Sequence, residues 1–122
     1  MIWHPELKAR WPSLPLYQQI LMVCNELNRA QNTMPDRREN RHAIERALEL
    51  LDFTIAGLAA GSRLREFLRA RECMAALYIA QRPAPTASLQ RGLMQLNAEV
   101  WRRVGEGGSR QEKDQGKSKR VI

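Results

Sequence analysis

The apolar residues of this chain recur at helical spacing in four stretches, and proline or glycine residues separate those stretches. The stretches cover about residues 15–32, 36–61, 62–82 and 86–104. No segment alternates polar and apolar residues for long enough to indicate a strand. Because short connections join neighbouring helices in an antiparallel sense, the pattern predicts an all-α fold, an up-down-up-down antiparallel four-helix bundle over residues 14–104.

Local signals place the helix ends. Asp36 is expected to cap the second helix, with Glu39 three residues later in a capping-box-like pattern, and the helix is expected to end near Gly61. Ser62 is a candidate cap for the third helix, which the Arg82-Pro83-Ala84-Pro85 segment ends. The fourth helix is expected to begin at Thr86 or Ser88. Gly92 within it either weakens the helix or permits close packing.

Each predicted helix has one apolar stripe that is expected to face a common core. The stripes are Tyr17, Ile20, Leu21, Cys24, Leu27 and Ala30; Ile44, Ala47, Leu48, Leu51, Ile55 and Leu58; Leu64, Phe67, Leu68, Met74, Ala75 and Tyr78; and Leu89, Leu93, Leu96, Val100 and Val104. Cys24 and Cys73 lie on or beside these stripes, which predicts two buried free thiols in a reducing compartment.

The two ends of the chain differ from the bundle. Residues 1–13 form a lead-in in which Trp3, Leu7 and Trp11 share one face if residues 4–10 make a short helix. That face is interpreted either as a flap over the core or as a docking arm for another subunit. Residues 105–122 are polar, glycine-rich and of mixed charge, which predicts a disordered basic tail.

The inventory of residues argues against several classes of protein. No apolar run is long enough to cross a membrane, and the N-terminus lacks the apolar region of a secretory signal, so a cytoplasmic protein is expected. His4 and His42 lie far apart, and no ExxH motif accompanies them, which argues against a metal site. Since neither a paired nucleophile and base nor a phosphate-binding glycine loop is present, we expect a non-enzymatic protein without a cofactor.

Arginine is the residue type that points to a function. The net charge is +7, and residues 1–104 carry 14 arginines and one lysine against 10 carboxylates. Guanidinium groups bind phosphate bidentately and remain charged at any working pH, so RNA or DNA is the expected partner. Without stacking aromatics, such a patch is expected to contact the backbone and not base identity. The candidate nucleic-acid-binding residues are Arg37, Arg38, Arg41, Arg63, Arg65, Arg69 and Arg71.

For each of these arginines alone, an exposed surface residue is the competing interpretation. Arg71 lies near the apolar stripe of the third helix, so it must extend outward, pair with a carboxylate or face a subunit interface. The carboxylates of Glu45, Glu49 and Asp52 are expected to pair with Arg41 or Arg46, or with another subunit. Because the three tryptophans exceed what a small core holds, and Arg71 needs a partner outside its own stripe, a homo-oligomer is predicted.

Three motifs carry a family resemblance. The segments LPLYQQ, MPDRR and GSRLREFL, within about residues 14–104, resemble the Avd proteins, the accessory variability determinants of diversity-generating retroelements. Leu14, Pro15, Tyr17, Pro35 and Arg38 match the motif positions. The resemblance implies a basic four-helix bundle assembled as a homopentameric barrel, which binds a reverse transcriptase and template RNA and supports mutagenic cDNA synthesis. A related family, from intervening sequences of ribosomal RNA genes, implies the alternative of a protein or RNA interaction module without a polymerase partner.

Overall fold

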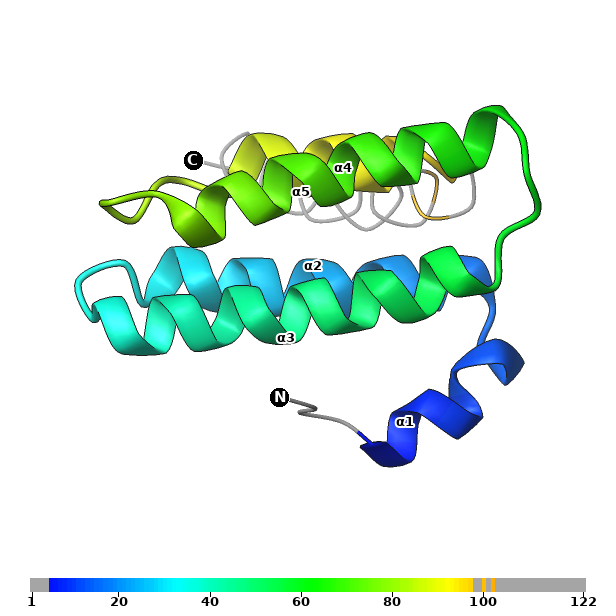
Figure 1. The fold of residues 1–122 in the computed structure, drawn as a ribbon, viewed down its shortest axis with the longest axis horizontal. Helices are drawn as coiled ribbons and strands as arrows, with labels where there is room; N and C mark the ends of the chain where they lie inside the picture. Colours follow the sequence, from blue (N-terminus) through cyan, green and yellow to red (C-terminus); the bar gives the residue numbers. More distant parts are fainter. Residues whose placement is uncertain (1–4, 98–99, 101, 103–122) are drawn as a thin grey trace, which may run out of the picture.

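The computed structural model describes residues 5–97, 100 and 102, and this part of the chain is all-helical. Among the described residues, five α-helices follow one another along the chain, with one 3-10 turn after the first, and Figure 1 shows how they are arranged. Their bounds are α1 Pro5–Arg10, η1 Trp11–Ser13, α2 Leu16–Asn32, α3 Arg37–Ala56, α4 Ser62–Ile79 and α5 Ala87–Gln95. The predicted all-α class is confirmed, and α2 to α5 correspond to the four predicted helices.

The core lies between two layers of helices. α2 and α3 form one layer and α4 and α5 the other (Figure 1), and each of these four helices packs against two others. About half of the predicted stripe residues that the structure describes are buried, and most of the others are half-buried at the margins of the core. The buried apolar residues are Trp11, Ile20, Val23, Cys24, Leu27, Ala30, Ala43, Ile44, Ala47, Leu50, Leu51, Phe67, Met74, Leu93 and Val100.

The boundary between α3 and α4 differs from the prediction. The Asp36 cap is confirmed, because its carboxylate accepts a hydrogen bond from the Glu39 backbone N–H at 3.2 Å. However, α3 ends at Ala56 and not near Gly61. Ser62 is the first residue of α4 and does not cap it, since the N-cap position belongs to Gly61, whose φ of +149° only glycine adopts readily.

The fourth predicted helix is shorter than expected. α5 ends at Gln95, although the apolar pattern predicted a helix to Val104. The side chain of Asn97 accepts a hydrogen bond from the backbone N–H of Val100 at 3.2 Å, and this local bond competes with continuation of the helix. Val100 and Arg102 are helical again, but Val104 lies outside the described residues.

The lead-in forms the short helix that its spacing predicted, and Trp11 after it enters the core. Trp11 is 1% exposed, and its indole Nε1–H donates to the Thr54 hydroxyl at 2.9 Å. Its ring meets Phe53 edge to face at a centroid distance of 6.0 Å. The argument that the tryptophans exceed a small core is therefore wrong for Trp11, which fills it. Trp3, Trp101 and the predicted tail over 105–122 lie outside the described residues.

α4 buries less of its surface than its apolar pattern predicted. Phe67 and Met74 are its buried residues, whereas Leu68 is 43% exposed and Cys73 is exposed. The expectations that Leu68 and Cys73 belong to the core are wrong. α4 packs against α3 on one side and against α5 on the other, so only a narrow stripe of its surface faces the core. Phe67 and Met74, which lie seven residues apart on one face of the helix, form that stripe.

Three hydrogen bonds that involve side chains join α2 to the starts of α3 and α5. The buried Asn40 side chain donates to the Ala30 carbonyl at 2.7 Å, which satisfies the end of α2 from the start of α3. The Thr86 hydroxyl donates to the Leu27 carbonyl at 2.8 Å, and the Thr86 backbone N–H donates to the Gln31 side chain at 2.7 Å. Thr86 therefore fixes the start of α5 against α2.

Candidate nucleic-acid interface

The first three candidate arginines line one surface cleft. The Asp36 cap starts α3, so Arg37 and Arg38 are its first two residues and Arg41 lies one turn later. Together with side chains farther along α3 and at the end of α4, they enclose an open cleft of about 470 Å³, which we call the arginine cleft. The lining residues are Arg37, Arg38, Arg41, His42, Glu45 and Tyr78.

The electrostatics of this cleft favour an anion. None of the guanidinium groups of Arg37, Arg38 and Arg41 lies within 4.0 Å of a carboxylate of the described residues. The Asp36 carboxylate already accepts the Glu39 backbone N–H at this end of α3 and meets part of the positive end of the helix dipole, so the positive charge of the cleft comes from the arginine side chains. Neighbouring cations without carboxylate partners repel one another, and a bound phosphate relieves that repulsion.

Tyr78 is the functional residue that sequence reasoning missed. It was expected in the core, yet it is half-buried on the wall of the arginine cleft. Its hydroxyl donates to Glu45 Oε1 at 2.7 Å, and the Arg41 guanidinium carbon lies 4.8 Å from the centroid of its ring. The hydrogen bond to Glu45, together with desolvation, raises the pKa of Tyr78.

The expectation of an arginine patch without aromatics is therefore wrong for this cleft. A tyrosine near a helix end, with arginines one helix away, is the signal that was available. Tyr78 was missed because its position on the apolar stripe of the third predicted helix assigned it to the core, although the predicted antiparallel order already brings the end of that helix to the start of the second.

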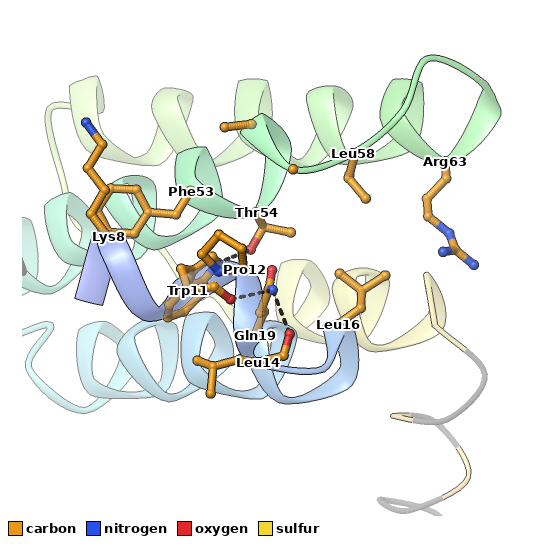
Figure 2. Close-up of a pocket in the computed structure, with 12 residues that line it drawn as sticks. Lys8, Trp11, Pro12, Leu14, Leu16, Gln19, Phe53, Thr54, Leu58 and Arg63 are labelled. Atoms are coloured by element: carbon orange, nitrogen blue, oxygen red, sulfur yellow. Dashed lines mark hydrogen bonds between the residues drawn. The ribbon is translucent and has the colours of Figure 1, made fainter. Parts of the chain in front are cut away.

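The four arginines of α4 do not join the cleft. Arg63 lines a separate apolar cleft of about 480 Å³ at the lead-in, where Figure 2 shows Lys8 and Arg63 on opposite sides of Trp11 and Thr54. Arg65 is exposed. Arg69 pairs with Glu66 at 3.2 Å on the same helix. The structure thus brings together the three candidate arginines of α3 and disperses those of α4.

Arg71 has a partner within its own chain. Its guanidinium donates to both carboxylate oxygens of Asp52, at 3.0 and 3.4 Å, and this hydrogen bonding raises the pKa of Arg71. Of the three interpretations offered for Arg71, pairing with a carboxylate is the observed one. The argument that it needs a partner from another subunit is therefore wrong. As both side chains are partly exposed, the pair contributes little to stability.

Other polar side chains of α3 have partners on the neighbouring helices. Arg46 pairs with Glu26 of α2, at 3.0 Å between the Arg46 Nε and Glu26 Oε2, and both side chains are 12% exposed. Glu45 accepts the Tyr78 hydroxyl, and Asp52 accepts Arg71. These partners come from other helices, so α3 is tied to both of its neighbours through its polar side chains.

Three further observations bear on function. Within the described residues, no three His, Cys, Asp or Glu side chains gather closely enough to hold a metal ion. No described helix is both long and apolar enough to cross a membrane. The thiol of Cys24 is buried near the Gln90 carbonyl, and burial raises its pKa to about 12, which keeps it protonated and unreactive.

Comparisons of the chain with protein-family models, with curated protein sequences and with solved structures found no match.

Proposed function

We propose that this protein is a non-enzymatic accessory protein that binds nucleic acid through the arginine cleft and supports a retroelement reverse transcriptase in mutagenic cDNA synthesis. The nucleic-acid part of the proposal rests on the cleft. The polymerase part rests on the resemblance of three sequence motifs to the Avd proteins. Both parts are consistent with a small basic helical protein that acts in the cytoplasm.

One observation carries the nucleic-acid proposal. Arg37, Arg38 and Arg41 line one open cleft at a helix N-terminus, and none of them pairs with a described carboxylate. Elsewhere in the described residues Arg46, Arg69 and Arg71 pair with carboxylates, whereas the three cleft arginines lie together around one hollow. A cluster left without such partners fits a surface that an external polyanion covers.

The proposed assembly is an up-down-up-down antiparallel bundle that forms a homopentamer. The short connection of residues 33–36 between α2 and α3 supports the antiparallel order. The apolar side chains that α4 leaves exposed, Leu68 at 43% and Ile79 at 76%, support a subunit contact. The number five comes from the resemblance. In a ring, the arginine cleft would repeat in every subunit and form a multivalent polycation.

The test measures binding of labelled single-stranded RNA over a range of salt concentrations. Each neutralised phosphate is expected to contribute a log–log slope of about −0.7 on a single strand. Arg37→Gln together with Arg38→Gln should weaken binding. It should also reduce the magnitude of that slope by the amount that about two phosphate contacts contribute. The matched control is Arg69→Gln with Arg71→Gln, which removes equal charge from arginines that already pair with Glu66 and Asp52. Equal effects of the two double variants would overturn the assignment to the cleft.

The polymerase partner is tested separately. A tagged protein should retain a reverse transcriptase encoded beside it when both are co-expressed. If the gene has no reverse transcriptase neighbour and RNA binding persists, the intervening-sequence type of interaction module becomes the better account.

A further inference from the structure

The arginines of the cleft differ in how they are held. Arg41 lies over the Tyr78 ring, and the Tyr78 hydroxyl is anchored on Glu45, so three side chains from two helices form one chain of contacts. Arg37 and Arg38 have no such support from a described aromatic ring or carboxylate. A guanidinium supported on one side by a ring offers its other side to a second flat group.

Carboxylates border the arginines of the cleft on both sides. Asp36 and Glu39 flank Arg37 and Arg38 at the start of α3, where the Asp36 carboxylate accepts the Glu39 backbone N–H. Glu45 lies four residues beyond Arg41, about one turn farther along the helix. The contact with the Tyr78 ring therefore distinguishes Arg41 from Arg37 and Arg38, and Glu45 marks the far border of the arginine side.

The surface beyond Glu45 extends this border. Glu45 and Tyr78 also line a neighbouring cleft that contains Glu49 and Asp52. A phosphate backbone that ran along α3 would meet these three carboxylates in turn. A strand is therefore expected to cross α3 at its first turns, with its phosphates on the arginine side.

We propose that Arg41 is a stacking platform for one nucleobase, positioned by Tyr78 and Glu45, and that the arginine cleft therefore takes single-stranded nucleic acid in preference to duplex. This inference rests on the proposed function and assigns different roles within the cleft. Arg37 and Arg38 hold the phosphate, Arg41 meets the base, and Tyr78 is a positioning residue that acts through Arg41. Bases are open to stacking in a single strand, whereas in a duplex their faces are covered by neighbouring base pairs.

The experiment compares three probes of about 12 nucleotides, a length within the usual range of single-strand sites. They are a thymidine strand, an abasic strand with the same number of phosphates, and a duplex. The wild-type protein should bind the thymidine strand about 5-fold to 100-fold more tightly than the abasic strand, the range that one stacked base gives. Equal affinity for these two strands would overturn this inference and leave the proposed function intact. Binding of none of the probes would overturn both.

Variants then separate stacking from charge. Arg41→Lys keeps the charge but loses the planar group, so it should remove the preference for the thymidine strand and retain abasic binding and its salt slope. Arg38→Lys is the matched control and should keep the preference. Tyr78→Leu should act like Arg41→Lys, because it removes the ring beneath Arg41.

Arg41 is exposed, so its replacement leaves the core intact and the protein folded. An Arg41→Lys protein that kept the full preference for the thymidine strand would overturn the role of Arg41. If Tyr78→Leu lowered binding of the abasic and thymidine strands equally, Tyr78 would have only a structural role.

Discussion

The side chain of Cys24 links the core of this protein to its behaviour at high pH. It is 3% exposed, and burial raises the pKa of its thiol to about 12, above the ordinary value near 9.0. The pKa of the Cys24 thiol is higher in the folded protein than in the unfolded chain. The contribution of the protonated thiol to the stability of the fold is therefore complete below about pH 9 and is lost as the pH rises toward 12. The unfolded chain then releases the proton first.

We therefore predict that the free energy of unfolding falls between about pH 9 and 12, with Cys24 contributing at most about 1.4 kcal/mol per pH unit. Urea unfolding at several pH values measures this slope. The Cys24→Ala protein is the control and should lose stability less steeply over the same window. Parallel slopes for the two proteins would show that another group causes the loss.

Hydrogen bonds between individual residues show which parts of the structure could be predicted from the sequence. The Asp36 cap and the end of α2 at Thr33 follow from neighbours within four residues, so local patterns sufficed for both. The Trp11–Thr54 bond spans 43 residues, and the Tyr78–Glu45 bond spans 33. Such bonds depend on which helix ends meet in space, so the arginine cleft was predictable in its arginines but not in its tyrosine.

At the scale of the elements, two glycines have opposite roles. Gly61 joins α3 to α4 with φ +149° and ψ −171°, a region that is essentially restricted to glycine. Gly92 lies inside α5, and a Cβ there would meet nothing within 4 Å, so close packing does not explain it. Of the two interpretations of Gly92, the weakening of the helix is the one that remains.

Alanine at each position tests this distinction. Gly61→Ala should destabilise the protein by about 1–3 kcal/mol, because the connection is forced out of its conformation. Gly92→Ala should stabilise it by about 0.5–1 kcal/mol, since alanine is the better helix former. Urea unfolding of both proteins gives the two values. A stabilising Gly61→Ala or a destabilising Gly92→Ala would contradict this account of the connections.

At the scale of the whole molecule, the exposed apolar side chains of α4 are the feature that bears on the oligomeric state. Leu68 and Ile79 are the large apolar side chains that the described surface leaves most exposed. An apolar groove of about 450 Å³ between α4 and α5, lined in part by Leu77, Leu89 and Leu96, adds to this surface. An apolar groove together with exposed apolar side chains on the same helix is typical of a contact with another protein.

We predict that light scattering returns a mass several times the 14.1 kDa of one chain, about five times if the family resemblance extends to assembly. Leu68→Glu together with Ile79→Lys should lower that mass without lowering helix content. The matched control, Gln81→Glu with Gln95→Lys, adds the same charges at exposed polar positions and should leave the mass unchanged. A monomeric wild-type protein at micromolar concentration would contradict the proposed assembly.

The central claim is that nucleic acid occupies the arginine cleft, and arginine footprinting measures this directly. The protein is treated with an arginine-specific dicarbonyl reagent with and without single-stranded RNA, and modification is quantified for each residue by mass spectrometry. RNA is predicted to protect Arg37, Arg38 and Arg41 strongly, and Arg65 and Arg69 little. Strong protection of the α4 arginines with none at Arg37, Arg38 and Arg41 would contradict the account.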